Sequence, residues 1–295
     1  MQETLFLNED VAASCSQLSY QYPFVTAHVI GHSVMGKPLL ALRCGEGEQK
    51  IHINAAFHGN EWITSALLMR FMNELSATYG GIDVWGLEDH QVAYLREEVT
   101  VWAVPMVNPD GAELVQCGIH ESHPMYHQLV HNNGGSADFS NWKSNIRGVD
   151  LNDQFPAYWD EECARRGVFE PAASDYPGPY PLSEPEAAAM AQFTETLRFK
   201  QVAALHTQGE EIYWNYRNYE PPEAQHIAAR LKRVSGYKAI KLTGSDAGYK
   251  DWFIKQYRKP GFTIEAGYGR TPLPFEHFEQ IYAKIQPLLL EYILL

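Results

Sequence analysis

The sequence contains little positive charge and no long apolar run. Its 23 lysine and arginine residues are outnumbered by 36 aspartate and glutamate residues, which gives a formal net charge of −13. Because no basic run is available to neutralise a phosphate backbone, we expect neither nucleic acid nor an anionic membrane surface as a partner. No apolar stretch approaches the ~20 residues that span a bilayer.

Cysteines are few, and the N-terminus lacks the features of a secretory signal. The cysteines are scattered without a C-x-x-C pair, which predicts reduced thiols that pack as small apolar side chains: Cys15, Cys44, Cys117 and Cys163. The opening residues, MQETLFLNED, carry neither a positive segment nor an apolar stretch, so we expect a cytoplasmic chain. No glycine-rich phosphate loop occurs, which argues against a nucleotide site.

The sequence does contain short β-branched runs that alternate with longer helical patterns, and 45% of its residues are hydrophobic. The runs predict strands at residues 39–43, 50–57, 99–107, 201–206 and 262–265, and the helical patterns predict helices at 61–79, 183–199, 223–235 and 274–295. Ser183 is expected to cap its helix, with Glu186 completing a capping box. We predict one α/β/α domain over residues 1–295, with a mixed, mostly parallel central sheet after a lead-in at 1–30.

Three residues at predicted strand ends have the ligand chemistry of a catalytic zinc site. Such a site needs three protein ligands drawn from His, Asp, Glu or Cys, and a fourth position open to water. His58 and Glu61 form an H-x-x-E pair at a strand-to-helix turn, and His206 ends a later strand. Because open α/β sheets place their ligands at strand ends, these side chains are the candidates for holding one Zn²⁺ per chain.

Several strings accompany these candidates: RGVDLN at 147–152, LH at 205–206, and FTIE, which ends at Glu265. Together they resemble the zinc carboxypeptidase family of metallopeptidases, from about residue 31 to the C-terminal helix. The strings GVDLNDQFP at 148–156, HTQGEEIYW at 206–214 and GYKDWF at 248–253 are similar to one bacterial branch of that family. This branch cuts the γ-D-glutamyl-diamino acid bond of peptidoglycan stem peptides.

The resemblance implies roles for the residues around the metal. Glu265 would be the general base, which takes a proton from the attacking water and passes it to the leaving amine. Lys143 stands at the position of the cation that faces the developing oxyanion, and Arg147 is the alternative. Asp150 would not bind the metal itself but would contact a ligand histidine and fix its orientation.

The sequence departs from the family pattern where carboxypeptidases grip the terminal carboxylate of their substrate. The family uses an Asn-Arg pair, whereas here Asn152 is followed by Asp153. An aspartate at this position repels a carboxylate and favours an ammonium. Lys250 matches the base of the family's specificity pocket, so Asp153 and Lys250 are expected to read the zwitterionic end of meso-diaminopimelate. Tyr249 is a further candidate pocket wall.

The expected function is therefore zinc-dependent hydrolysis of an amide bond in a peptidoglycan stem peptide. Two other enzymes share the fold and the ligands: a zinc carboxypeptidase of different peptide specificity, and a zinc deacylase of small N-acyl amino acids. The long, weakly periodic stretch at 118–175 favours a peptide, because a small acyl amino acid needs fewer walls. A stem-peptide-binding module is the non-enzymatic alternative, and the complete set of ligands together with Glu265 argues against it.

Overall fold

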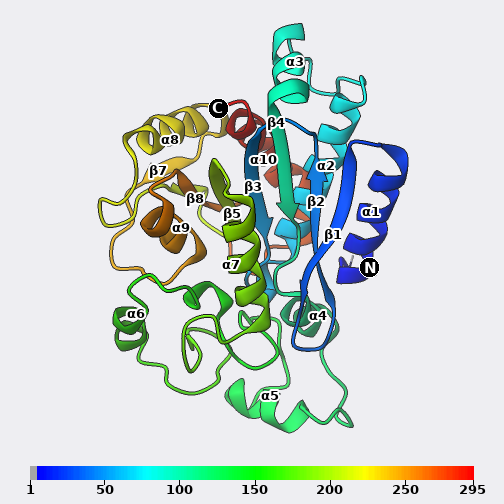
Figure 1. The fold of residues 1–295 in the computed structure, drawn as a ribbon. Coiled ribbons are helices and arrows are strands. Elements are labelled where there is room, and N and C mark those ends of the chain that lie inside the picture. Colours follow the sequence, from blue (N-terminus) through cyan, green and yellow to red (C-terminus); the bar gives the residue numbers. More distant parts are fainter. Residues whose placement is uncertain (1–4) are drawn as a thin grey trace.

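The computed structural model describes residues 5–295 and folds them around an eight-stranded sheet (Figure 1). The strand order is β1-β2-β4-β3-β5-β8-β6-β7. These strands are β1 (Val25–His32), β2 (Pro38–Cys44), β3 (Gln49–Ala55), β4 (Val99–Val104), β5 (Gln201–His206), β6 (Glu211–Tyr213), β7 (Lys238–Ile240) and β8 (Gly261–Glu265). The pairs β3·β4, β3·β5, β5·β8 and β6·β7 are parallel and the others antiparallel, which confirms the mixed, mostly parallel sheet.

Helices cover both faces of the sheet, and alternate residues of each central strand enter different cores. In β5, Ala203 and Leu205 pack in one hydrophobic cluster, whereas Val202 and Ala204 pack in the other. The first cluster is shared with α1 (Asn8–Gln21), α2 (Ile63–Tyr79), α8 (Pro222–Ser235) and α10 (Phe278–Ile293), and the second with α7 (Pro185–Leu197) and α9 (Tyr249–Tyr257). This period-two burial on both faces explains the near-continuous apolar runs of these strands.

The remaining helices are α3 (Asp89–Glu98), α4 (Pro109–Cys117), α5 (Tyr126–Asn132) and α6 (Trp159–Arg166), with short 3-10 turns η1 (Gly59–Glu61), η2 (Leu151–Asp153) and η3 (Phe275–His277). Figure 1 shows α5 and α6 among long loops, in the weakly periodic stretch at 118–175. Within residues 5–295, no helix combines the length and apolar character needed to cross a bilayer.

Three details differ from the sequence-based expectations. Helix α7 begins at Pro185 with Glu184 as its N-cap, so the prediction of Ser183 as the cap is wrong. Proline favours the first helical position, and the Ser183 hydroxyl instead donates to Gln154 Oε1 at 3.2 Å. The lead-in contains helix α1 and the edge strand β1. All the cysteines are free, but Cys117 is exposed and Cys163 half-buried, so the prediction of buried thiols holds only for Cys15 and Cys44.

Candidate metal centre

Neighbouring parallel strands bring the candidate residues to one edge of the sheet. His206 ends β5, and its register partner on β8 is Glu265. On the other side of β5 lies β3, and His58 follows three residues after the end of that strand. Because parallel strands end at the same edge, residues distant in the sequence meet there, as ligands do in other open α/β sheets.

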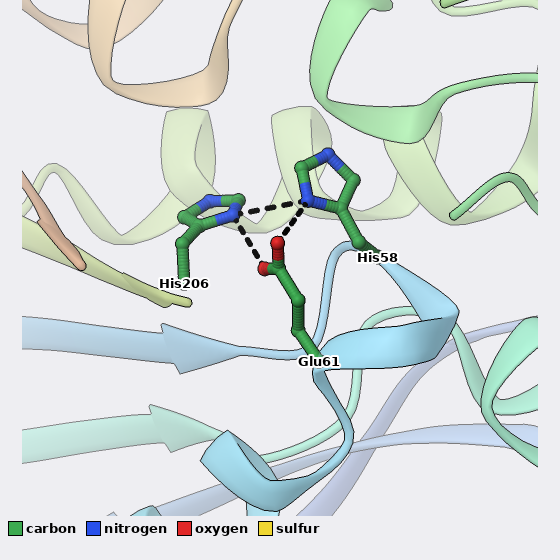
Figure 2. A group of neighbouring side chains, drawn as sticks. All are labelled: His58, Glu61 and His206. Carbon is green, nitrogen blue, oxygen red and sulfur yellow. Dashed lines mark hydrogen bonds and ion pairs between the residues drawn. The ribbon is translucent and has the colours of Figure 1, made fainter. Parts of the chain in front are cut away.

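His58, Glu61 and His206 converge on one point from three directions, as Figure 2 shows. His206 Nδ1 lies 3.3 Å from His58 Nδ1 and 2.9 Å from Glu61 Oε2, and His58 Nδ1 lies 3.0 Å from Glu61 Oε1. All three residues are buried. Burial alone would raise the pKa of the Glu61 carboxyl, but the charges of His58 and His206 hold it below its usual range.

This arrangement fits a tetrahedral zinc ion. Two donor atoms bonded at ~2.0–2.1 Å to the same ion stand about 3.3 Å apart, which is the spacing of the two imidazole nitrogens. On the far side of its ring, His58 Nε2 lies 3.2 Å from Asp150 Oδ1. When Nε2 donates to this carboxylate, Nδ1 keeps its lone pair and faces the centre, as a metal-ligating histidine requires.

The turn that carries His58 and Glu61 is held by close backbone packing and one asparagine. A Cβ atom at Gly59 would meet the backbone of Gly111 at 2.6 Å, so only glycine fits there. The Asn108 amide donates to the Phe57 carbonyl at 3.2 Å and to the Ser144 carbonyl at 3.1 Å. Asn108 also caps α4, and its side-chain oxygen accepts from the Gly111 backbone N–H. This asparagine therefore couples the H-x-x-E turn to the segment that contains Lys143.

Glu265 lies beside the three ligand candidates without joining their cluster. Burial raises the pKa of its carboxyl to about 8, and the charge of Glu61 adds to the rise, while His58 and Lys143 act in the opposite direction. A cation held by the cluster would draw this pKa down again. A general base works best with a pKa near the operating pH, so this environment suits proton transfer.

The two candidate oxyanion cations lie in different places. The Lys143 ammonium is 3.8 Å from Asp150 Oδ2, and Asp150 also contacts the ligand candidate His58. Burial alone would lower its pKa, but Asp150 and then Glu61 leave it raised, so the group stays charged. The Arg147 side chain is 52% exposed, and within residues 5–295 its guanidinium pairs with Glu184 alone, at 3.5 Å. Geometry therefore favours Lys143 over Arg147 as the cation near the reaction.

The predicted specificity residues are occupied by partners within the protein. Asp153 forms an ion pair with Arg166, with 2.9 Å between Oδ2 and Nε. Lys250 is buried, 2.5 Å from Asp251 Oδ1 and 2.9 Å from the Asn215 carbonyl. To bind a substrate, either group would have to exchange these contacts.

The other two substrate-binding candidates also have partners. Asn152 is half-buried, and its side-chain oxygen accepts from the Tyr249 backbone N–H at 3.3 Å. The Tyr249 ring lies in the core, and its hydroxyl is 2.8 Å from Thr194 Oγ1. A role as pocket wall would require this ring to leave its core position. Arg166, the partner of Asp153, was not among the residues singled out from the sequence, because its pairing is long-range.

Comparison with known proteins agrees with this geometry. The model of the zinc carboxypeptidase family matches residues 11–281. The chain belongs to the zinc carboxypeptidase family. Members of this family are zinc-dependent hydrolases, so zinc is the cofactor that this donor set accommodates, and the chain is a metallopeptidase.

Two curated relatives cover most of the chain. It is 46% identical over 267 residues to Gamma-D-glutamyl-L-diamino acid endopeptidase 1 of Lysinibacillus sphaericus. The aligned region covers 90% of this chain and 66% of that protein. It is 38% identical over 287 residues to the uncharacterized protein YqgT of Bacillus subtilis strain 168. The aligned region covers 95% of this chain and 75% of that protein. The chain thus spans about two thirds to three quarters of these relatives' length.

Solved structures share the fold of this zinc carboxypeptidase family member. Thrombin activatable fibrinolysis inhibitor aligns with a TM-score of 0.75 and 19% identity, covering 99% of this chain and 75% of that one. Murein-tripeptide amidase MpaA from Escherichia coli O157 aligns with a TM-score of 0.54 and 21% identity, covering 90% of this chain and 91% of that one. Both comparisons confirm the α/β architecture.

The position of Asp150 leads to a prediction about metal affinity. Replacing Asp150 with Asn should weaken zinc binding by about 10- to 100-fold, because the carboxylate that fixes the His58 tautomer is lost. Competition with a chelator of known zinc affinity measures this change. Asp175, whose backbone N–H donates to Asp150 Oδ2 at 3.3 Å, offers a matched control. Asp175→Asn keeps that N–H and should leave the zinc affinity unchanged; an equal loss in both variants would contradict the role assigned to Asp150.

Proposed function

We propose that this chain hydrolyses the γ-D-glutamyl-meso-diaminopimelate bond of peptidoglycan stem peptides. The observation that carries the proposal is the Asn152-Asp153 pair beside the metal centre. Asp153 is buried and tied to Arg166, so the cation that would grip a main-chain carboxylate is missing from this position. The name of the 46% identical relative supports the same bond. Ordinary trimming of protein C-termini is therefore disfavoured.

In this proposal one peptidase domain spans residues 1–295, and His58, Glu61 and His206 hold a single zinc ion. Zinc supplies Lewis acidity there: it polarises a carbonyl and lowers the pKa of water. The buried carboxylate and the two imidazoles fix the position of that charge. The partner is a peptide, and no nucleic acid is involved.

The remaining steps belong to side chains of this chain. Glu265 accepts the proton of the water that attacks the scissile carbonyl and then donates it to the leaving amine. Its strand position next to His206 places it at the same edge of the sheet as the ligands. Lys143 provides positive charge where the carbonyl oxygen becomes negative, and Asp150 holds that ammonium nearby.

A panel of matched peptides tests the bond specificity. We expect cleavage of L-Ala-γ-D-Glu-meso-diaminopimelate to release free diaminopimelate, detected by mass spectrometry. The control peptide contains the same residues with glutamate linked through its α-carboxyl. A standard carboxypeptidase substrate and a small N-acyl amino acid complete the panel. Faster cleavage of either of these two, or equal cleavage of both glutamyl linkages, would overturn the proposed bond.

The role of Lys143 can be separated from that of Arg147. Lys143→Met should lower kcat by about 10²- to 10³-fold with little change in KM, because an oxyanion partner acts mainly in the transition state. Arg147→Met is the matched control, since the Arg147 guanidinium is exposed and pairs with Glu184. The kcat of this variant should stay within about threefold of wild type. The reverse pattern in steady-state kinetics would assign the oxyanion to Arg147.

A further inference from the structure

A charged pocket of about 350 Å³ lies next to the Asp150-Asp153 segment. Its walls come from the last turns of α6 and from two loops: Glu162, Arg165, Arg166, Asp175, Gly244 and Ser245. None of these residues belongs to the metal centre. The pocket contains two guanidinium groups and two carboxylates in a small volume, which is a composition suited to a ligand of mixed charge.

The pocket is connected to the metal centre through a single carboxylate. Asp150 faces His58 with Oδ1, at 3.2 Å, and accepts the Asp175 backbone N–H with Oδ2, at 3.3 Å. The Asp175 side chain then pairs with Arg166 Nη1 at 2.8 Å. Asp150 thus contacts both the ligand candidate His58 and the backbone of the pocket wall.

Both signs of charge remain accessible inside the pocket. The side chains of Arg165 and Asp175 are 33% and 35% exposed, whereas Glu162 is buried beneath them. Arg165 makes its ion pairs with Glu162 and Asp246 through Nη2. Across residues 5–295, its Nε and Nη1 groups have no hydrogen-bond acceptor. Arg165 can thus donate further hydrogen bonds, from Nε or from Nη1, to an anionic ligand.

The opposite wall is fixed to α6 by ion pairs. The Asp246 backbone N–H donates to Glu162 Oε2 at 2.8 Å, and its carboxylate binds Arg165 at 3.0 Å and Arg217 at 2.8 Å. Asp246 immediately follows Gly244 and Ser245, so these contacts hold the loop against α6. The pocket is therefore a preformed feature of the fold, which limits the entropy lost on binding.

We propose that this pocket binds the zwitterionic far end of the diamino acid: Arg165 pairs with its carboxylate and Asp175 with its ammonium. The proposal rests on the proposed function, because it names the part of that substrate that the pocket recognises. A diamino acid carries both charges on one carbon, and the pocket presents both counter-charges on neighbouring groups. All four groups have partners within the protein, but Asp153 and Lys250 are buried, whereas the side chains of Arg165 and Asp175 remain 33% and 35% exposed.

The test uses three tripeptides that differ only at the far end of the diamino acid: the free zwitterion, its carboxamide, and the analogue without the far amino group. Wild type should prefer the zwitterion over either analogue by about 10- to 100-fold in kcat/KM. Arg165→Gln should abolish the preference over the carboxamide by slowing the zwitterion alone. Asp175→Asn should abolish the preference over the deaminated analogue, and asparagine tolerates the positive φ of 66° at this position.

Arg217→Gln is the matched control, because Arg217 also binds Asp246 but does not line the pocket. We expect it to keep both preferences. If Arg217→Gln erases the preference over the carboxamide as Arg165→Gln does, the effect acts through Asp246 and the proposed pairing is wrong. If the wild type cleaved all three peptides at equal rates, the pocket assignment would be overturned, but the proposal for which bond is cleaved would still stand. Cleavage of none of them would instead overturn the proposed function.

Discussion

Glu265→Gln is expected to keep its zinc while its turnover falls by about 10²- to 10⁴-fold, the usual contribution of a positioned general base. The amide has nearly the same shape as the carboxylate but cannot accept the proton of the attacking water. Zinc retention is expected because Glu265 stands outside the cluster of His58, Glu61 and His206. Elemental analysis gives the metal content, and steady-state kinetics on the stem tripeptide gives kcat.

Glu211→Gln provides the control for this experiment. Glu211 on β6 is the register partner of Glu265, so the Glu211→Gln substitution removes a similar negative charge from the neighbouring strand. The Glu211 carboxylate already accepts a hydrogen bond from the Tyr213 hydroxyl at 2.7 Å and lies 3.7 Å from the Lys238 ammonium. We therefore do not expect it to take the proton of the attacking water. A similar loss in both variants would show that charge, rather than proton transfer, is responsible. Wild-type kcat in Glu265→Gln would mean that another group is the base.

The central strands and the convergence of the three ligand candidates were predictable from the sequence because their signals are local. Buried parallel strands have nearly continuous apolar sequences, and the apolar run at 201–206 coincides with β5. Since parallel strands end at one edge, polar residues placed after such runs were expected to meet. The structure brings His58, Glu61 and His206 together in this way.

The edge strand β1 was not predicted from the sequence because it lacks a continuous apolar run. Half of its residues are exposed, and a bulge between Val29 and Gly31 interrupts the alternation. Helix α4 was missed for a different reason. It is short, and its Asn-Pro start, although a helix start signal, is also common in turns.

The charged pocket could not be predicted from the sequence, because its contacts are long-range. Helix α6 has acidic residues in its first turn and Arg165 and Arg166 in its last, a distribution that the helix dipole explains by itself. Nothing in that local pattern indicates that Arg166 pairs with Asp153, or that Arg165 reaches Asp246 from 81 residues away. Charge pairing of this kind depends on the loops around α6, which have no periodic signal.

His58→Ala is expected to lose both zinc and activity. His58 supplies one of three ligands and also connects the centre to Asp150, so its removal opens the coordination shell and leaves Glu61 and His206 to hold the ion alone. Zinc content should fall from about one per chain to near zero after dialysis, and cleavage of the stem tripeptide should fall to background. The exposed His226 on α8 serves as a control, and His226→Ala should retain both.

A thermal measurement separates metal loss from misfolding in the same variant. A ligand that binds only the folded state at 100 times its Kd stabilises a protein by about 2.7 kcal/mol, so added zinc should raise the Tm of the chelator-treated wild type. Chelator-treated His58→Ala should unfold cooperatively near the Tm of the metal-free wild type, with no further rise on zinc addition, because the donor set is incomplete. A zinc-dependent rise equal to that of wild type, or a full equivalent of bound zinc, would show that the ion is held elsewhere and that the convergence of these three side chains has another cause.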